Sequence, residues 1–544
     1  MHAQFNGRPQ VPTPINEPVR HYAPHSPERA AIKAKLAAMA GATIDMPVIV
    51  GGKECRTGQT APSVMPHDHR HVLGQYHKAT APIVDEAVAA AREAHREWSG
   101  WSFDQRAAVF LKAAELLTTS WRDVLNASTM LGQSKTVFQA EIDSACEIID
   151  FWRFNVHYGQ QLLDEQPISD RTMWNQLEYR ALEGFVYAVT PFNFTSIAAN
   201  LPTAPALMGN AVIWKPASSA IYSAYHLMKL FEAAGMPPGV INFVPGDAAM
   251  ISKVLLSHRD LAGVHFTGST EVFNDMWKTI GASMSSYRSY PRIVGETGGK
   301  DFVIAHPSAD VAAFAAAVVR GGYEFQGQKC SAVSRIYVPR SMWNDARDRL
   351  VSMIDDIKMG DIQDFRNFMG AVIDERAFDK ITGHVEAARK TARVVAGGTA
   401  DKSRGYFIRP TLLETGDPGF RTLCEEIFGP VVTAYVYDDD RWSETLDLVD
   451  RTSPYALTGA VFAQDRRAIV EAASALRYAA GNFYVNDKPT GAVVGQQPFG
   501  GARASGTNDK AGSKLNLVRW VSARAIKENF APPRDYKYAF MAAE

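Results

Sequence analysis

The stretch FVYAVTPFNFTSIAANLPTAPALMGNAVIWK, residues 185–215, determines the fold class. It begins and ends with short apolar runs, 185–190 and 211–215, that are rich in β-branched and aromatic residues. Two further runs of this kind, VINFV (240–244) and GVHFT (263–267), follow it, and turn-forming residues come after each. Short apolar runs bounded by turns are typical of buried strands, so we predict four strands here.

Apolar residues at helical spacing lie between and before these strands. Residues 220–234 carry an apolar face that stops at Gly235, which suits the end of a helix. Residues 82–98 and 104–119 have the same spacing and are predicted to be amphipathic helices. Fully apolar strands joined by helices indicate a parallel sheet covered on both faces, with ligands at the carboxyl ends of the strands. We therefore predict an α/β fold.

A second α/β segment is predicted to begin near Gly295 and to continue to about Val485. It includes a helix over 309–320, with Ser308 as the residue that caps its amino end. The chain has 544 residues, which is enough for several domain-sized units. The tail from 505 to 544 carries several aromatic residues and is a candidate oligomer contact.

Composition argues against several classes of protein. Lys and Arg number 57 and Asp and Glu number 58, so no global field favours nucleic acid or an anionic membrane. There is no run of about 18 uninterrupted apolar residues, so no membrane span is predicted. The four cysteines are scattered without a CxxC pair, which indicates a reducing compartment. The first residues lack the pattern of a secretory signal or transit peptide. We expect a cytoplasmic protein, with the mitochondrial matrix as the alternative.

Most familiar enzyme motifs are absent from the sequence. The chain contains no GxGxxG, GxxxxGK[ST], HExxH or GxSxG pattern. The alternate histidines of HDHRH (67–71) could meet a metal ion on one side of an extended segment. Neighbouring prolines favour a solvated loop instead, and no fourth ligand is indicated. We therefore predict no metal site.

The most informative cysteine is Cys330, in the segment FQGQKCSAVSR (325–335). Gly327 allows a tight turn before it, and Lys329 together with the N–H groups of that turn could favour the thiolate. The alternative is a buried and inert thiol, because a free cysteine also packs as a small apolar side chain.

Two further segments favour a reactive thiol. ETGGKD (296–301) places Glu296 beside a glycine pair, and TPFNFT (190–195) places Asn193 in the loop after a strand. A thiol, a carboxylate and an amide donor are the groups needed to form and hydrolyse a thioester. No histidine accompanies them, which argues against a papain-like protease. For Glu296 alone, a cap of a helix or turn is an open alternative.

Seven motifs then occur in the order and spacing typical of one enzyme family. They are PFNFT, IWKP, FTGST, ETGGKD, GQKCSAVSR, EEIFGP and QPFGG. By these motifs the chain resembles the aldehyde dehydrogenase superfamily. The segments 138–155, 481–510 and 519–528 are most similar to one branch, which oxidises L-glutamate 5-semialdehyde, the open form of Δ1-pyrroline-5-carboxylate.

The resemblance covers nearly the whole chain and implies its architecture. It implies a Rossmann-type parallel-sheet NAD domain, an α/β catalytic domain and a small β oligomerisation arm. The implied parts are an amino-terminal arm with the helical part of the NAD domain (1–155), an oligomerisation hairpin (156–183), the dinucleotide-binding core (184–294), the catalytic thiol domain (295–490), and a return segment with an oligomerisation flap (491–544). A homo-oligomer is implied, as a dimer or a higher assembly.

The family motifs also imply catalytic roles. Cys330 is the implied nucleophile, which forms a thiohemiacetal and then a thioester. Asn193 is the implied donor to the oxyanion. Glu296 is the implied base that activates water for hydrolysis.

NAD is the implied cofactor. The FTGST motif places Gly268 and Ser269 at the pyrophosphate, where the amino end of a helix favours negative charge. The full implied set is Thr190, Phe192, Lys215, Ser218, Gly268, Ser269, Thr270, Glu271, Val272, Glu426 and Phe428. The alternatives are an ordinary strand-to-helix turn and, for Lys215, a solvated lysine. Ser218 stands where many NAD-preferring relatives carry a glutamate, so charge does not exclude NADP.

The loop DKPTGAVVG (487–495) is the implied site for the amino-acid end of the substrate. The implied substrate residues are Ser331, Gly491, Ala492, Phe499 and Glu147, with a plain helix-surface position as the alternative for Glu147. Ala492 replaces a serine that is common in this branch. The implied function is NAD-dependent oxidation of L-glutamate 5-semialdehyde to L-glutamate in proline catabolism by a monofunctional enzyme. The alternatives are a dehydrogenase of another aldehyde and a catalytically inactive protein on the same fold.

Overall fold

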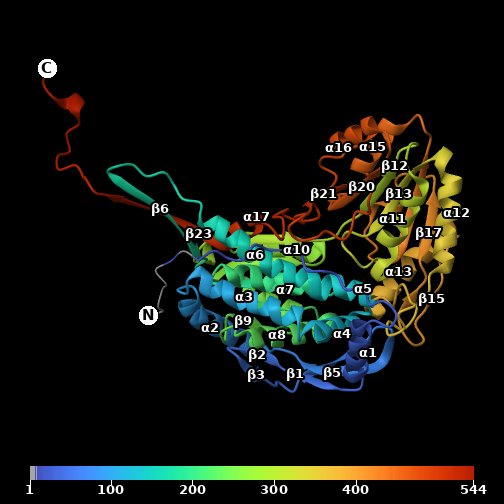
Figure 1. Ribbon diagram of the computed structural model, residues 1–544, viewed down its shortest axis with the longest axis horizontal. Helices are drawn as coiled ribbons and strands as arrows, with labels where there is room; N and C mark the ends of the chain where they lie inside the picture. Colours follow the sequence, from blue (N-terminus) through green and yellow to red (C-terminus); the bar gives the residue numbers. More distant parts are fainter. Residues whose placement is uncertain (1–6, 8) are drawn as a thin grey trace.

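The computed structural model describes residue 7 and residues 9–544 of the chain (Figure 1). Two α/β units lie side by side, each built on a seven-stranded sheet. A two-stranded arm projects from the first unit and carries the carboxyl end of the chain away from the body. The predicted α/β fold is confirmed.

The four predicted strands form the centre of the first sheet. The order is β11-β10-β7-β8-β9-β2-β3, and the strands from β11 to β9 run parallel. The short strands β2 and β3 add an antiparallel edge that was not predicted. The strands are β2 (Val48–Val50), β3 (Lys53–Cys55), β7 (Phe185–Val189), β8 (Ala211–Lys215), β9 (Ile241–Phe243), β10 (Leu261–Thr267) and β11 (Arg292–Glu296).

Helices cover both faces of this sheet because successive strand side chains point to opposite sides. Val186 and Ala188 of β7 join one core with α3, α4, α6, α7 and α8, whereas Phe185 and Tyr187 join another with α2, α9 and α10. The helical segments are α1 (Pro27–Ala40), α2 (Ala81–Trp98), α3 (Phe103–Thr118), α4 (Arg122–Gln133), α5 (Val137–Ala140), the π-helix η1 (Glu141–Glu147), α6 (Ile148–Leu163), α7 (Thr195–Leu207), η2 (Ser218–Ala220), α8 (Ile221–Ala234), α9 (Ala248–Leu256), α10 (Thr270–Ala282) and η3 (Met284–Ser286).

The three helices predicted for this unit are confirmed as α2, α3 and α8. The last of them ends as predicted at Gly235, which has a left-handed φ of 89°. None of the described helices combines the length and the apolar character needed to cross a bilayer.

The second sheet has the order β14-β17-β18-β13-β12-β20-β21, and only β14 runs antiparallel to its neighbour. Its strands are β12 (Asp301–Ala305), β13 (Val333–Pro339), β14 (Arg393–Ala396), β17 (Thr411–Thr415), β18 (Val431–Tyr437), β20 (Thr458–Phe462) and β21 (Asn482–Val485). Its helices are α11 (Val311–Tyr323), η4 (Glu324–Gly327), α12 (Arg340–Asp356), α13 (Glu375–Ala388), α14 (Arg421–Cys424), α15 (Trp442–Arg451) and α16 (Arg466–Ala475).

The helix predicted over 309–320 is α11, but the prediction that Ser308 caps it is wrong. Asp310 is the N-cap, and its side chain accepts the backbone N–H of Ala313 at 3.0 Å. The Ser308 hydroxyl instead accepts the backbone N–H groups of Gln464 and Asp465. It therefore joins the start of α11 to the segment after β20.

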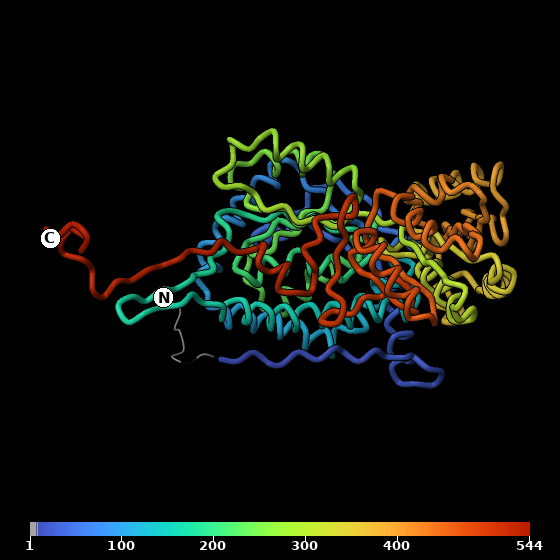
Figure 2. Tube along the Cα trace, turned by 90° about the horizontal axis from the view of Figure 1, so that it is seen from above, coloured from blue at the N-terminus to red at the C-terminus, as the bar shows by residue number. Residues whose placement is uncertain are grey.

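The projecting arm consists of β6 (Met173–Ala181) and β23 (Val521–Asn529), paired antiparallel (Figure 2). The predicted hairpin at 156–183 starts too early, since α6 continues to Leu163. Its second strand also comes from the far end of the chain. Two short helices, α17 (Lys514–Leu517) and η5 (Val518–Trp520), precede β23. One more, η6 (Ala539–Met541), lies beyond the arm near the carboxyl end.

A small sheet joins the two units. It is formed by β1 (Ile44–Met46), β4 (Thr60–Met65) and β5 (Asp68–His77), and the remaining short pairs are β15 (Ala400–Asp401) with β16 (Phe407–Ile408) and β19 (Tyr455–Ala456) with β22 (Ala502–Arg503). The solvated loop predicted for 67–71 is therefore wrong, because His67 is 2 % exposed in the β4–β5 turn. The turn packs on the second unit, where Tyr406 donates its N–H to the Pro66 carbonyl at 3.1 Å. Among the described residues, no three His, Cys, Asp or Glu side chains are grouped to hold a metal.

Candidate active site

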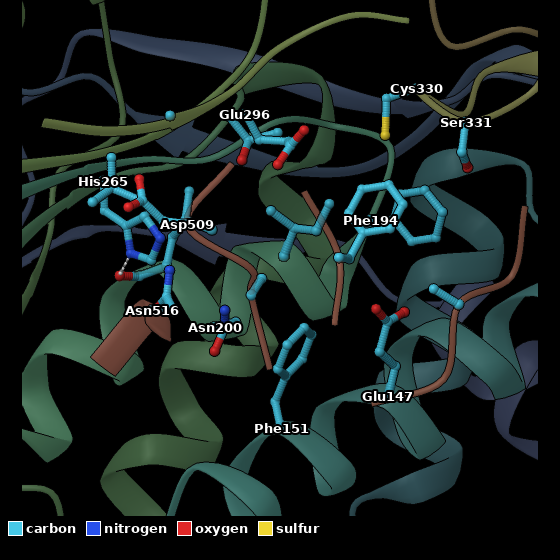
Figure 3. A pocket seen from close by; sticks show the side chains of 18 of the residues that line it. Glu147, Phe151, Phe194, Asn200, His265, Glu296, Cys330, Ser331, Asp509 and Asn516 are labelled. Carbon is cyan, nitrogen blue, oxygen red and sulfur yellow. Dashed lines mark hydrogen bonds between the residues drawn. The ribbon is translucent and has the colours of Figure 1, made fainter. Parts of the chain in front are cut away.

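A single cavity between the two units contains most of the predicted catalytic and substrate residues (Figure 3). Its walls come from η1, α6, α7, the ends of β10 and β11, the loop before β13, and the segment that follows β21. The predicted residues that line it are Cys330, Glu296, Ser331, Glu147, Gly491, Ala492 and Phe499.

Cys330 sits at the end of a strained turn that follows α11. Phe325, Gln326 and Gly327 all have positive φ, at 49°, 57° and 64°. A Cβ on Gly327 would lie 2.3 Å from the Gly429 carbonyl oxygen, so only glycine fits there. The Gln326 amide holds the turn by donating to the Ala371 carbonyl at 2.7 Å and by accepting the Gly370 N–H at 2.9 Å. The nucleophile candidate is thus on a rigid support.

The Cys330 thiol is buried and close to negative charge. Burial, followed by the charge of Glu296, raises its pKa well above the ordinary value, and the N–H of Ser331 lowers it only in part. The predicted help from Lys329 is wrong, because its ammonium group pairs with Glu324 at 3.2 Å. The thiol therefore needs a neighbouring base to become a nucleophile.

Glu296 ends β11, and its carboxyl group lies at the same end of the cavity as the Cys330 sulfur (Figure 3). Its Oε1 accepts the N–H of Gly501 at 3.1 Å. Burial raises the pKa of Glu296 well above its ordinary value. A cap of a neighbouring helix or turn, the open alternative, is excluded because the partner N–H is distant in the chain. A carboxylate with a raised pKa is a stronger proton acceptor than an ordinary one, as a general base requires.

Asn193 approaches the thiol from the other unit. It is 3 % exposed, and its Nδ2 donates to the Gln328 carbonyl at 3.2 Å, two residues before Cys330. The amide is thus beside the turn that carries the sulfur, where an oxyanion donor is required.

The predicted cofactor residues gather at the carboxyl ends of the parallel strands. Thr190 follows β7, Lys215 ends β8, and Gly268 follows β10. Ser269 caps α10 and accepts the Val272 N–H at 3.4 Å, so the amino end of this helix faces the same edge. Such an end attracts a phosphate group.

Lys215 offers an independent test of whether a dinucleotide fits. The side chain is only 8 % exposed, and its ammonium group donates no hydrogen bond to the described residues. Burial lowers its pKa. A buried cation without an acceptor at this edge suits the ribose hydroxyls of a nucleotide. A solvated lysine, the alternative, is excluded by its burial.

The remaining cofactor candidates divide into two groups. Phe192 and Phe428 pack edge to face at 5.7 Å, and Glu426 beside them accepts the Gly299 N–H at 2.9 Å. These three lie toward the second unit, near the Cys330 turn. Among the others, Ser218 begins η2, and Glu271 and Val272 are exposed on α10. The Thr270 hydroxyl is directed toward Tyr455 and Ala504, and the buried Thr190 hydroxyl accepts from the Trp214 indole.

The loop after β21 contributes two unused backbone donors to the cavity wall. Gly491 has a left-handed φ of 91°, and neither its N–H nor that of Ala492 donates to a described residue. The Ser331 hydroxyl donates to Thr490 Oγ1 at 2.8 Å and so connects this loop to the nucleophile turn. Successive free N–H groups in such a turn form an anion site.

Glu147 ends the π-helix η1 and faces the same cavity (Figure 3). The Ser196 hydroxyl donates to its Oε2 at 3.1 Å. Burial and the nearby Asp143 carboxylate raise the pKa of Glu147 to about 8. The helix-surface alternative is therefore wrong.

Comparison with known proteins agrees with this arrangement. Residues 54–525 match the model of the aldehyde dehydrogenase family. The chain belongs to the aldehyde dehydrogenase family. It is 51% identical over 98% of its length to the mitochondrial Δ1-pyrroline-5-carboxylate dehydrogenase of Dictyostelium discoideum, of which it covers 97%, and 46% identical over 97% of its length to the human enzyme of that name, of which it covers 94%. A solved structure of the Mycobacterium tuberculosis Δ-pyrroline-5-carboxylate dehydrogenase bound with NAD is similar with a TM-score of 0.96 and 53% identity, covering 99% of this chain and 100% of that one.

Several residues of this aldehyde dehydrogenase site were not predicted from the sequence. Phe151, Phe194, Asp509 and Thr490 also line the cavity. All four lie within or next to motifs that carry the family resemblance, and those motifs are the signal for them in the sequence. Their role depended on which side of each element faces the cavity, and that is set by packing between the two units.

Proposed function

We propose that this chain oxidises L-glutamate 5-semialdehyde, the open form of Δ1-pyrroline-5-carboxylate, to L-glutamate with NAD, as a monofunctional enzyme of proline catabolism. One observation carries the proposal. A single cavity is lined by Cys330 and Glu296 and also by Gly491 and Ala492, whose N–H groups donate to no described residue. An aldehyde that also bears an α-carboxylate suits both sets of groups. The names and the NAD-bound structure of the relatives support this choice.

The first step is attack by Cys330 on the aldehyde carbon. Glu296 takes the thiol proton, because a raised pKa makes its carboxylate a stronger base. The new S–C bond turns the carbonyl oxygen into an oxyanion, and Asn193 Nδ2 and the Cys330 N–H stabilise it. Asn193 then exchanges its bond to the Gln328 carbonyl for one to the substrate oxygen.

NAD, when bound, accepts the hydride that leaves the tetrahedral carbon. The amino end of α10 with Gly268 and Ser269 would hold its pyrophosphate, Lys215 its adenosine ribose, and Glu426 with Phe428 its nicotinamide end. Ser218, Glu271 and Val272 would lie beside the adenosine part of the cofactor. Thr270, Thr190 and Phe192 would act indirectly, through their contacts with Tyr455, Trp214 and Phe428.

The second half-reaction hydrolyses the thioester. After the thiol proton has passed from Glu296 to solvent, the carboxylate removes a proton from a water molecule, whose oxygen attacks the acyl carbon, and the Cys330 thiolate leaves. Water supplies the second oxygen of the product carboxylate. Glutamate then departs from the anion site formed by Gly491, Ala492 and the Ser331 hydroxyl. Phe499 lines the chain of the substrate, and neutral Glu147 closes the cavity wall near Phe151.

The direct test is NADH formation by the pure protein with L-pyrroline-5-carboxylate, beside hexanal as an aldehyde without a carboxylate. We expect turnover of the first substrate at far lower concentration, and loss of activity in Cys330→Ala. Preference for hexanal would favour the second candidate, a dehydrogenase of simple aldehydes. NADP in place of NAD tests whether the absence of a carboxylate at Ser218 relaxes cofactor choice.

We further propose a homo-oligomer built through the projecting arm. The arm and the tail beyond it expose large apolar side chains, including Trp174 (52 %), Phe530 (60 %) and Phe540 (84 %). Exposed apolar groups on a projecting element mark a protein contact. Light scattering should give a molar mass that corresponds to more than one copy of the chain, and removal of residues 530–544 should weaken the assembly.

The four free cysteines support a reducing compartment, for which we propose the cytoplasm, and fractionation of the source cells tests this proposal.

A further inference from the structure

An extended segment near the amino terminus runs along the outside of α6. We call residues 9–25 the N-terminal strap, and residues 486–499 the substrate loop. In Figure 2 the strap is the long blue segment that crosses the body with few turns. The strap ends at α1, far from Cys330 in the sequence and outside the catalytic cavity. Nothing in the reaction requires it to contact the substrate.

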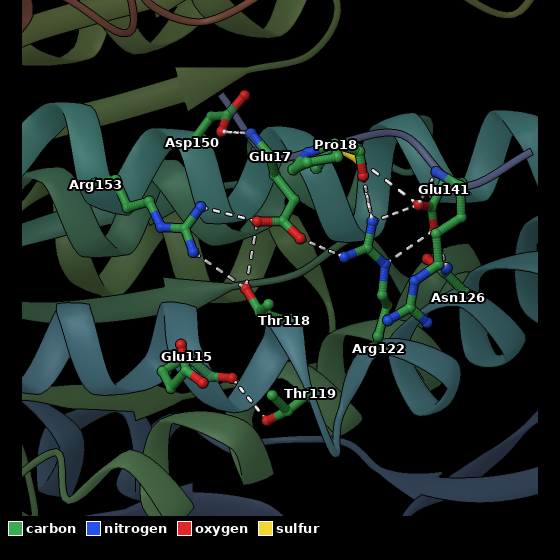
Figure 4. A network of polar contacts seen from close by, with 12 residues as sticks. Glu17, Pro18, Glu115, Thr118, Thr119, Arg122, Asn126, Glu141, Asp150 and Arg153 are labelled. Atoms are coloured by element: carbon green, nitrogen blue, oxygen red, sulfur yellow. Dashed lines mark hydrogen bonds and ion pairs between the residues drawn. The ribbon is translucent and has the colours of Figure 1, made fainter. Parts of the chain in front are cut away.

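Buried ion pairs fix the strap against the first unit (Figure 4). Glu17 accepts from Arg122 and, at 2.8 Å, from Arg153. Glu141 accepts from Arg122 and from the Tyr22 hydroxyl. Glu17, Arg122 and Glu141 are all less than one-tenth exposed. Since breaking a buried pair leaves an uncompensated charge, the strap is a rigid part of the fold.

From this rigid segment a single side chain reaches the substrate loop. Asn16 Nδ2 donates to the Val494 carbonyl at 2.8 Å, and its Oδ1 accepts from Gln496 Nε2 at 3.0 Å. The second Nδ2 proton goes to Asp150 Oδ2 at 2.8 Å, and Asp150 Oδ1 accepts the Glu17 N–H at 2.7 Å. Asp150 thus sets the orientation of the Asn16 amide, and every polar atom of that amide is in use.

Two hydrogen bonds hold the substrate loop, at Thr490 and at Val494, with only three residues between these two anchors. Thr490 is tied to Ser331 at one side, and Val494 is tied to Asn16 at the other. Next to Val494, Gly495 has a φ of 83°, and a Cβ there would lie 2.2 Å from the Phe154 ring. The loop is therefore pressed against α6. Between the anchors lie Gly491 and Ala492, which line the cavity and whose N–H groups donate to no described residue.

We infer that Asn16, oriented by Asp150, is a positioning residue that holds the substrate loop in the shape that binds the α-carboxylate. The inference rests on the proposed function, in which Gly491 and Ala492 are the carboxylate donors. Asn16 acts on selectivity and leaves the chemistry of Cys330 unchanged, because it contacts neither the thiol turn nor Glu296. Preorganised donors bind more tightly than mobile ones, since less ordering is required on binding.

The test compares Asn16→Ala with Gln160→Ala. Gln160 also holds the strap, through the Val11 N–H at 3.0 Å and the Pro9 carbonyl at 2.7 Å, but it does not touch the loop. We expect Asn16→Ala to raise the KM for L-pyrroline-5-carboxylate about ten-fold, from the loss of two loop hydrogen bonds, with kcat nearly unchanged. Its kcat/KM with hexanal should stay within about two-fold of the parent, and Gln160→Ala should match the parent with both aldehydes. Equal losses with both aldehydes would overturn the inference.

Hydrogen exchange measured on the substrate-free protein gives a second readout that does not depend on the substrate. Asn16→Ala should speed exchange in the peptide that covers residues 491–499, and Gln160→Ala should not. If the parent protein fails to oxidise pyrroline-5-carboxylate, the proposed function falls, while faster loop exchange would still show the anchoring by Asn16. Unchanged exchange in Asn16→Ala would overturn the positioning role whatever the substrate is.

Discussion

Replacement of Glu296 by glutamine separates the two half-reactions that the site is proposed to carry out. Glutamine keeps the shape of the side chain, and its Oε1 still accepts the Gly501 N–H. It cannot take a proton. The other ionisable side chains that line the cavity are Glu147, His265 and Asp509. His265 is hydrogen-bonded to the Leu201 carbonyl, Asp509 accepts from Thr507, and Glu147, with a pKa of about 8, is already protonated at neutral pH, so none of the three replaces the base.

The effect on the two steps should differ in size. Loss of a general base costs about 10²–10⁴-fold, so hydrolysis of the thioester should slow by at least about 100-fold. Attack by Cys330 should suffer less, because removal of the Glu296 charge lowers the pKa of the thiol. In Glu296→Gln, formation of the thioester is therefore expected to be faster than its hydrolysis.

Stopped-flow measurement of NADH checks this difference. Glu296→Gln mixed with NAD and L-pyrroline-5-carboxylate should release about one NADH per active site in a burst, followed by a slow steady state. The parent enzyme, run in the same way, should show linear turnover. A Glu296→Gln variant with kcat within about three-fold of the parent would refute the role of Glu296. A large fall in kcat without a burst would show that the carboxyl group acts mainly on the thiol.

Three further predictions concern the cofactor edge and the stability of the fold. Lys215→Ala should raise the KM for NAD by about 10-fold or more, from loss of a charged hydrogen bond, and leave the KM for the aldehyde unchanged; a shift in both would contradict the placement at the ribose. Arg122→Ala should lower the free energy of unfolding in urea by about 3–5 kcal/mol, because Glu17 and Glu141 would remain buried without a partner, and a loss below about 1 kcal/mol would argue against a rigid strap. Burial lowers the pKa of His265 to about 3. Since the unfolded side chain titrates near 6.5, this neutral histidine stabilises the fold above that pH, and stability should fall in urea titrations as pH drops from about 6.5 toward 4.

Local sequence patterns were sufficient for the first sheet and its helices. The runs at 185–190, 211–215 and 263–267 are mostly apolar, and such runs form central strands in which both faces are covered. The antiparallel edge formed by β2 and β3 could not be predicted in this way. Those strands are only three residues long, and they owe their pairing to contact with β9.

The errors at Ser308, Lys329 and His67 share a cause. Each of these polar residues found a partner or a neighbour that is far away in the sequence or on an adjacent turn. Ser308 bonds to residues near 465, Lys329 pairs with Glu324, and His67 is covered by the second unit. The local sequence pattern predicts which element carries a polar group but not which distant residue binds it. The anchoring of the substrate loop by Asn16 belongs to the same class of feature.

The most direct test of the account is the identity of the covalent adduct. Glu296→Gln should be mixed with NAD and L-pyrroline-5-carboxylate, quenched in acid to keep the substrate amino group protonated, digested and analysed by mass spectrometry. We predict one γ-glutamyl group, joined as a thioester, on the peptide that contains Cys330. An adduct on Cys55, Cys146 or Cys424, or none during active NADH release, would contradict it.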